Sequence, residues 1–250
     1  MAKADGATIH LARPAGPPDV DRTYKIAQDT AVKSGESCAA ILLAAGQSRR
    51  MGAFKPLLPF SNKTVIECCI DYLRHGGVDT IVVVLGHRAN EVLERLEHLS
   101  VLFAINPDPS SEMGASIAAG VRALPETTPA TLIALADHPA IPASVVSTLL
   151  ATWREGARLV IPTWQGRGGH PVLVDLSFKA ELLQLGATGG LKAFFDAHQN
   201  ELERIAVDSP FIARDIDTWD DYSALHEEVT GQPAPERSNN QTNETPDSLI

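Results

Sequence analysis

The sequence predicts a three-layer α/β/α domain built on a doubly wound, mostly parallel sheet. Short apolar segments typical of strands alternate with amphipathic segments typical of helices, as in CAAILLA, TVIECCIDYLRH, TIVVVLG, ANEVLERLEHL and VLFAI. The segment at 81–85 is apolar at every position, which is typical of a parallel strand with helices on both faces. The length of 250 residues suits one such domain with tails, and no internal linker interrupts it.

In chain order, the pattern predicts strands at 38–44, 80–86 and 101–105, with helices at 64–75 and 89–99 between them. A helix of small residues follows Pro107 and Pro109, and Pro142 opens another helix after a strand that begins at 131. Later strands are expected at 158–162 and 171–174, and a last helix after Thr218. Right-handed crossovers bring the carboxyl ends of parallel strands to one rim, where ligands bind in folds of this class.

Both ends of the chain differ in composition from its centre. Three early prolines interrupt residues 1–36, although 21–33 predict a weak helix. Residues 230–250 are polar and rich in turn formers, so they bury too little apolar surface to offset the entropy lost on ordering. We therefore expect an N-terminal extension, a folded domain at 37–229 and a disordered polar tail.

The charge balance and the cysteines restrict the function classes. The chain has 31 acidic and 21 basic residues, a formal charge of -10, which argues against nucleic acid or an anionic membrane as the main partner. No segment is apolar for long enough to predict a signal peptide or a membrane span. Cys38, Cys68 and Cys69 have no metal-binding spacing and suit a reducing compartment. We expect a cytoplasmic protein.

The segment at 41–60, ILLAAGQSRRMGAFKPLLPF, is typical of a phosphate-binding loop. An apolar strand stops at a small-residue turn whose glycine can adopt backbone angles that other residues avoid. Three cations follow, Arg49, Arg50 and Lys55. Backbone N–H groups and cations of this kind bind nucleotide phosphates. Neither a P-loop nor a GxGxxG dinucleotide motif is present, because the glycine spacing of both is missing.

The pattern LAAGxSxRMGxxKxLLPF in this segment resembles the signature of the MobA-like nucleotidyltransferases, and within them that of the molybdenum cofactor cytidylyltransferases. The resemblance implies a Rossmann-like fold similar to that of nucleotide-diphospho-sugar transferases. It also implies that the domain at 37–229 is the nucleotidyltransferase. The implied nucleotide-binding residues in this segment are Leu43, Ala44, Ala45, Gly46, Arg50 and Lys55, and the last two also enter the implied catalytic set.

The segment TLIALADHPAIP at 131–142 is an apolar strand that ends in an acid. Pro139 cannot donate a hydrogen bond to the sheet, so we expect Asp137 to project from the carboxyl rim. A carboxylate there suits Mg2+, which binds through one or two carboxylates and substrate phosphates. An aspartate that accepts hydrogen bonds from turn amides is the structural alternative. The sequence LADHP resembles the family's LADQP, which implies a catalytic and metal-binding Asp137.

Two further segments resemble family elements around the substrates. Within NPDPSSEMGASIAAG at 106–120, the resemblance implies that Gly114 and Ser116 bind the nucleotide, while helix capping is an equally good explanation of Ser116. Within RGGHP at 167–171, it implies that His170 contacts the acceptor through a phosphate or a pterin, against an equally good structural explanation.

The segment DIDTWDDY at 215–222 resembles the family's DIDTPED. The resemblance implies Asp217 as a second metal ligand, while Thr218 and Asp221 have the spacing of a helix capping box. One departure from the family lies at 186–191, where GATGGL replaces GDxGAR and lacks its acid and its arginine. Lys192 supplies a positive charge one position later, but one residue along a helix turns the side chain in another direction. The missing acid and arginine therefore leave open an acceptor other than that of the family.

The resemblance implies an Mg2+-dependent enzyme that moves CMP from CTP to the phosphate of molybdopterin or molybdenum cofactor and releases pyrophosphate. The LAAG turn favours CTP over GTP, because guanylyltransferase relatives read LAGG there. Three alternatives stay open: transfer from GTP, another phosphorylated acceptor such as a sugar phosphate, and a noncatalytic module that delivers cofactor to a client molybdoenzyme. Neither nucleic acid nor a membrane is an expected partner.

Overall fold

A computed structural model describes residues 37–48, 50–108 and 112–237 of the chain. The expected N-terminal extension with its weak helix, and the predicted tail from residue 238 onward, lie outside the described residues. No helix in the described part is long and apolar enough to cross a membrane.

The core of the molecule is one mixed sheet with the strand order β10-β7-β9-β6-β1-β4-β5, and β8 pairs with β7. Only β9 runs antiparallel to its neighbours β6 and β7 within this order, so the sheet is mostly parallel as predicted. Its strands are β1 (Ala39–Ala44), β4 (Thr80–Leu85), β5 (Leu102–Ile105), β6 (Ala130–Leu135), β7 (Leu159–Trp164), β8 (Arg167–Gly168), β9 (Val172–Asp175) and β10 (Leu202–Ala206).

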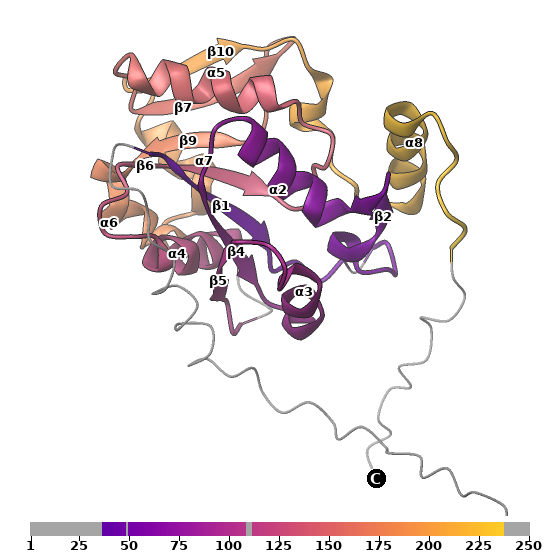
Figure 1. Cartoon of the computed structure of the whole chain (residues 1–250). Helices are drawn as coiled ribbons and strands as arrows, with labels where there is room; N and C mark the ends of the chain where they lie inside the picture. Colours follow the sequence, from indigo (N-terminus) through magenta and orange to yellow (C-terminus); the bar gives the residue numbers. More distant parts are fainter. Residues whose placement is uncertain (1–36, 49, 109–111, 238–250) are drawn as a thin grey trace, which may run out of the picture.

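Helices cover both faces of the sheet, which confirms the predicted three-layer class (Figure 1). One face carries α2 (Val65–His75), α3 (Ala89–Leu96) and α5 (Ala143–Arg154). The other carries α4 (Met113–Ala123), α6 (Lys179–Leu182) and α7 (Gly190–Ala197). The central strand β1 is buried from both sides, with Leu42 in the first apolar cluster and Ile41 in the second. Alternate residues of a strand point to opposite faces, so a strand covered twice is apolar throughout.

The last helix, α8 (Trp219–Thr230), lies beside the hairpin of β2 (Pro59–Phe60) and β3 (Lys63–Thr64), at the edge of the molecule (Figure 1). Its start is fixed by a capping box in which Thr218 and Asp221 bond each other's backbone amides, as the sequence predicts. Tyr222 is buried and its hydroxyl donates to the carbonyl oxygen of Pro59 at 2.5 Å. This docking places the segment before α8 next to the basic loop that follows β1.

Candidate active site

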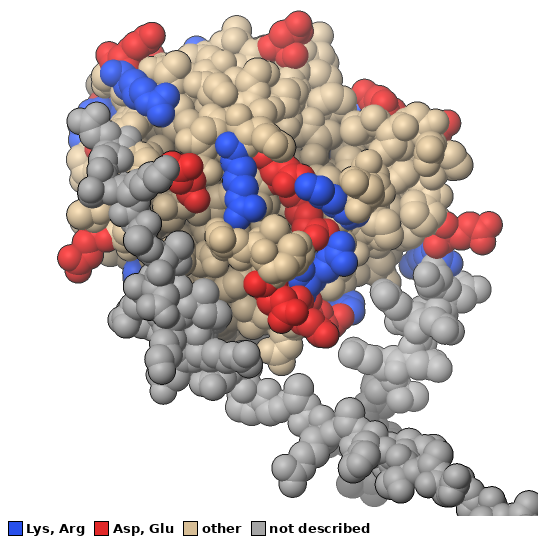
Figure 2. All heavy atoms as spheres, in the orientation of Figure 1, with Lys and Arg blue, Asp and Glu red and all other residues tan. Residues whose placement is uncertain are grey.

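A cavity of about 280 Å3 opens at the carboxyl ends of β1 and β6, the rim on which ligands bind in folds of this class. Figure 2 shows acidic and basic atoms gathered on this face, close to where β6 ends. Most of the predicted nucleotide-binding residues reach the cavity. Its lining includes Leu43, Ala44, Ala45, Gly46, Lys55, Ser116 and Asp137, together with Ser48, Asn106, Asp108 and Met113. Asn106 begins the 106–120 segment that the resemblance places near the substrates, whereas Asp108 and Met113 were not predicted site residues.

The turn after β1 differs from expectation in its backbone. Gly46 does not adopt a left-handed conformation, so the angles predicted for it are wrong; the left-handed residue is Ser48, at φ 51°. The Ser48 hydroxyl accepts a hydrogen bond from the Lys55 amide at 3.2 Å, which folds the basic loop back over the turn. A Cβ atom at Gly46 would meet no protein atom within 4 Å. Packing inside the protein therefore does not require a glycine there, and the predicted contact of Gly46 with a nucleotide stays a prediction.

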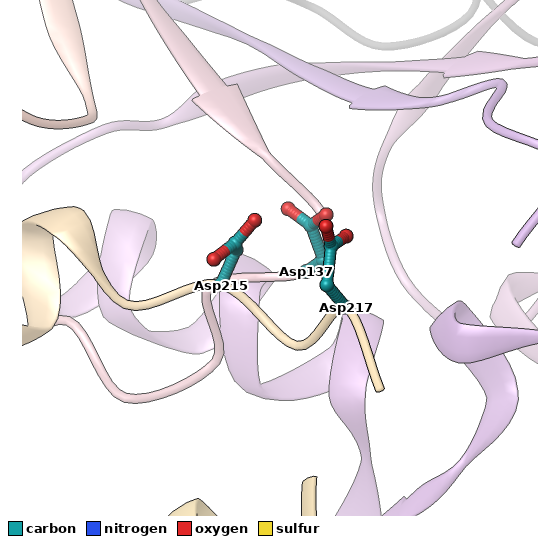
Figure 3. A group of neighbouring side chains, drawn as sticks. All are labelled: Asp137, Asp215 and Asp217. Atoms are coloured by element: carbon teal, nitrogen blue, oxygen red, sulfur yellow. The ribbon is translucent and has the colours of Figure 1, made fainter. Parts of the chain in front are cut away.

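Three carboxylates meet beside the cavity. Asp137 follows β6, while Asp215 and Asp217 lie before α8, and Figure 3 shows all three side chains pointing to the same side. One oxygen from each lies within 4.8 Å of the others. The Ile216 amide donates to the Asp137 carbonyl oxygen at 3.1 Å, which holds the two segments together. Since alternate residues of an extended segment share a face, the spacing of Asp215 and Asp217 was the signal for the acid that sequence reasoning missed.

Lys55 and Arg50 neutralise part of this acidic cluster. The Lys55 ammonium lies 2.7 Å from Asp217 and 3.7 Å from Asp137, and its side chain is only 11% exposed. Arg50 reaches Asp217 at 2.8 Å, but its side chain is 79% exposed. An exposed ion pair contributes little because water and salt screen it, so of these two cations Lys55 interacts more strongly with the cluster.

The environment favours charged carboxylates in the cluster. The hydrogen bond from Lys55 holds the pKa of Asp217 below its usual range, and the charges of Lys55 and Arg50 act in the same direction. Burial tends to raise the pKa of Asp137, but a hydrogen bond from His138 and the charge of Lys55 outweigh it and lower that pKa. Both groups are therefore carboxylates at neutral pH, the state that a hard divalent cation binds.

The chemistry of these donors fits Mg2+ or a similar cation. Asp137, Asp215 and Asp217 offer hard oxygen ligands from two segments, and the mutual separation of their oxygens suits contact with one ion. Asp217 takes no part in capping α8, because Thr218 and Asp221 form the cap. Its carboxylate is thus left for the cluster, where the structure pairs it with Lys55 and Arg50.

Two histidines lie near Asp137: His138, which is buried, and His170, which is partly buried. His138 Nδ1 lies 3.0 Å from Asp137 Oδ1, and its ring is buried. The ring of His170 packs edge-on against that of His138, at 6.1 Å between centroids. His170 does not line the first cavity; it lines a second one, on the side of β7 and α7. Its predicted contact with the acceptor stays a prediction.

The two residues of α4 that were predicted to bind the nucleotide, Ser116 and Gly114, lie in different surroundings. Ser116 lies in the fourth position of α4, and its hydroxyl accepts a hydrogen bond from the side-chain amide of Asn106 at 2.8 Å. Since the residue before α4 is Glu112, the capping explanation of Ser116 is wrong. Both side chains are buried at the cavity wall. Gly114 does not line the cavity; a Cβ there would come within 2.6 Å of the Gly186 nitrogen. Packing of α4 against the segment at 185–186 therefore explains this glycine, and its assignment to the nucleotide stays a prediction.

Comparison with known proteins gives one family match and several similar proteins. The MobA-like NTP transferase domain family matches residues 40–202. The molybdenum cofactor cytidylyltransferase of Escherichia coli is 29% identical over 192 residues, which cover 76% of this chain and 96% of that protein. The nicotine blue oxidoreductase of Paenarthrobacter nicotinovorans is also 29% identical, over 187 residues that cover 71% and 91% of the two chains.

Among solved structures, a homologue of Mycobacterium tuberculosis Rv0371c from Mycobacterium sp. strain JC1 superposes with a TM-score of 0.69 at 30% identity. The match covers 78% of this chain and 97% of that one. A nucleotidyl transferase from Methanothermobacter superposes with a TM-score of 0.69 at 25% identity. That match covers 79% of this chain and 99% of the other one. The matched part is therefore close to the full length of each relative.

Proposed function

The chain is a nucleotidyltransferase that belongs to the MobA-like NTP transferase domain family, and we propose that it moves CMP from CTP to the phosphate of molybdenum cofactor. The observation that carries this proposal is the placement of Lys55 between Asp137 and Asp217 at the mouth of a cavity on the strand rim. The E. coli relative, whose name states that activity, supports the choice of substrates.

In the proposed reaction, a phosphate oxygen of the acceptor attacks the α-phosphorus of CTP, and the bond to the β-phosphate oxygen breaks so that pyrophosphate leaves. The protein supplies position and charge and forms no covalent intermediate. The turn at 44–46 lies against the nucleotide, and Gly46 leaves room for close approach. Lys55 and Arg50 take up the negative charge that develops on the leaving pyrophosphate.

Mg2+ is the proposed metal, and Asp137, Asp215 and Asp217 are the residues that would hold it. When bound, such an ion neutralises phosphate charge and orients the phosphates for in-line attack. His138 fixes the Asp137 carboxylate by its hydrogen bond, so the remaining oxygen faces Lys55. A triphosphate brings negative charge to Lys55 and Arg50, which lets both cations exchange Asp217 for phosphate oxygens.

The choice of CTP rests on the LAAG turn. Ala45 lines the cavity, and its Cβ packs against Gly86, where an added Cβ would lie 3.0 Å away. A glycine at this position, as in guanylyltransferase relatives, would remove that packing and reshape the cavity wall. GTP and a sugar phosphate are the alternative donor and acceptor.

A second candidate function is an oxidoreductase activity. Identity to the oxidoreductase relative equals identity to the cytidylyltransferase relative, at 29% in both cases. An oxidoreductase needs no acid cluster beside a lysine, and this feature of the chain favours phosphoryl chemistry. If the protein oxidises a reduced nicotinamide cofactor in the presence of nicotine blue and turns over neither CTP nor GTP, the result would support the second candidate.

The direct test uses the purified chain with Mg2+, molybdenum cofactor and either CTP or GTP. We expect pyrophosphate release with CTP and a pterin product whose mass has increased by one CMP. An equal rate with GTP would overturn the choice of CTP. Intact cofactor with bound CTP and no product would overturn the proposed acceptor, and a sugar phosphate tested next would separate another acceptor from a noncatalytic module.

A further inference from the structure

The chain after the last helix returns to the active site. Gly231 ends α8 in the left-handed conformation, at φ 69°, and turns the chain away from the helix axis. The turn is fixed at Gln232, whose carbonyl oxygen lies 3.0 Å from Nδ1 of the buried His226. Residues 231–237, which we call the strap, then contact residues 50–57, the basic loop of the active site.

An apolar contact joins the strap to the basic loop. Ala234 of the strap is partly buried and packs against a third apolar cluster. Met51 of the basic loop belongs to this cluster and is only 2% exposed. Ile216, between Asp215 and Asp217, belongs to it as well. One cluster therefore connects the strap, the basic loop and the segment that carries two of the proposed metal ligands.

Arg237 closes the strap over the basic loop. Its guanidinium donates a hydrogen bond to the carbonyl oxygen of Met51 at 3.3 Å. The same Nη2 atom would lie 2.7 Å from a Cβ atom at Gly52, so the guanidinium rests directly on the backbone of this glycine. Gly52 has φ 65°, a conformation that other residues rarely adopt, and a side chain there would displace the guanidinium. Arg237 thus holds the two residues that follow Arg50.

The ion pairs of the basic loop and its contacts with the strap respond differently to a nucleotide. Asp217 holds the cations of the loop, at 2.8 Å from Arg50 and 2.7 Å from Lys55. In the proposed reaction both cations exchange this carboxylate for phosphate oxygens, so the two ion pairs cannot hold the loop once nucleotide is bound. The strap contacts a backbone carbonyl oxygen and apolar side chains, which a phosphate does not replace. A loop that is already ordered loses less conformational entropy when it binds a ligand.

We propose that the strap positions the basic loop for the β- and γ-phosphates of the nucleotide, with Arg237 as a positioning residue for Arg50 and Lys55. Arg237 is not among the described residues that line the cavity, so it acts through the backbone of the loop. This proposal rests on the proposed function, because it takes the basic loop as the part of the site that binds the triphosphate. Nucleotide binding then depends on a segment that follows α8.

Hydrogen exchange in the full-length chain, without nucleotide, tests whether the strap holds the loop. Amides of the loop, such as that of Met51, which donates to the Ser48 carbonyl oxygen at 3.2 Å, exchange with deuterium when the loop opens. Arg237→Ala removes the hydrogen bond from the strap, and Ala234→Asn places a polar side chain against the apolar cluster. Since each variant loses one contact, we expect the loop amides to exchange roughly threefold to tenfold faster in both.

Glu236→Ala is the matched control. Glu236 precedes Arg237, is exposed, and forms no side-chain hydrogen bond or ion pair with the residues that the structure describes, so its replacement should leave exchange of the loop unchanged. Arg237→Lys keeps a charged donor and should recover part of the protection. Arg237 is exposed, so its replacement leaves the apolar core intact, and thermal unfolding verifies that every variant is folded.

Calorimetric titration with CTP and with CMP, each with Mg2+, tests whether the held loop serves the phosphates. CMP lacks the β- and γ-phosphates, so Arg237→Ala and Ala234→Asn should raise the Kd of CTP roughly threefold to tenfold and leave the Kd of CMP unchanged. A loss of folded protein would weaken the binding of both ligands. An effect of charge alone would change the Kd of CTP in opposite directions in Arg237→Ala and Glu236→Ala, and Ala234→Asn, which changes no charge, would have no effect.

Unchanged exchange of the loop in both strap variants, or faster exchange with no change in the Kd of CTP relative to CMP, would overturn the proposal. If the expected pattern appears and no CMP is transferred to molybdenum cofactor, the proposed transfer is wrong while the role of the strap stands. If CMP is transferred and the pattern is absent, the transfer stands and the role of the strap is wrong. A wild type that binds GTP instead of CTP would make the proposed donor wrong, and the comparison of GTP with GMP would then decide the role of the strap.

Discussion

Replacement of Lys55 by alanine tests the most specific feature of the site. The Lys55 side chain is 11% exposed, and its ammonium contacts two carboxylates, at 2.7 Å and 3.7 Å. A cation about 4 Å from a phosphate charge contributes roughly 4 kcal/mol at an effective dielectric constant near 20. Since each 1.36 kcal/mol is a factor of ten in rate, Lys55→Ala should lower kcat/KM by up to about three orders of magnitude.

The same loss of charge at Arg50 is the matched control. Arg50 contacts the same Asp217, but its side chain is 79% exposed, so screening reduces its contribution. We expect Arg50→Ala to lower kcat/KM by roughly tenfold or less. Pyrophosphate release at several CTP concentrations gives both values, and thermal unfolding verifies that each variant is folded. Equal effects of the two substitutions, or near-wild-type turnover in folded Lys55→Ala, would refute the assignment of Lys55.

Other features of the chain give further expectations. Asp215→Asn should weaken Mn2+ binding, measured by electron paramagnetic resonance, because it removes a metal ligand. Asp220→Asn changes an exposed acid outside the cluster and should leave Mn2+ binding unchanged. Equal binding by the two variants would remove Asp215 from the metal site. The pKa of His170 is about 4 when folded and about 6.5 when unfolded, so its contribution to stability is present above pH 6.5 and is lost as the pH falls toward 4. Denaturant titrations should show a loss of about 3 kcal/mol over this window, and the loss should shrink in His170→Asn; an unchanged pH profile would contradict the low pKa. Burial raises the pKa of Cys38 to about 12 and that of Cys68 to about 11, so a thiol reagent at pH 8 should modify the native chain slowly and the urea-unfolded chain fast; equal rates would show that these thiols are not protected.

The fold was predictable because its strongest signals are local. The first strand was expected at 38–44 and is Ala39–Ala44, and the next helix was expected at 64–75 and is Val65–His75. A strand that is apolar at every position predicts helices on both faces of its sheet, whichever strands pair with it. The antiparallel direction of β9 did not follow from its sequence, because direction depends on the path of the connection from β7 through β8.

Most residues that the sequence proposed for the site line one cavity, but their contacts with one another could not be predicted. Lys55 and Asp217 are 162 residues apart, and the docking of α8 against the β2–β3 hairpin brings them together. Nothing in a local pattern encodes that distance. Asp215 was missed because the family motif drew attention to its neighbour, although its spacing from Asp217 put both on one face. The backbone conformation of Gly46 was mispredicted because the left-handed residue of this turn is Ser48, and open space lies beside Gly46.

The measurement that tests the central claim most directly follows the phosphates of CTP through the reaction. CTP labelled in its α-phosphate is incubated with the protein, Mg2+ and molybdenum cofactor, and a parallel sample carries the label in the γ-phosphate. Transfer of CMP predicts that the α-label appears in the pterin product and the γ-label in pyrophosphate. Label from the γ-phosphate in the pterin, or α-label that stays with the free nucleotide, would contradict it.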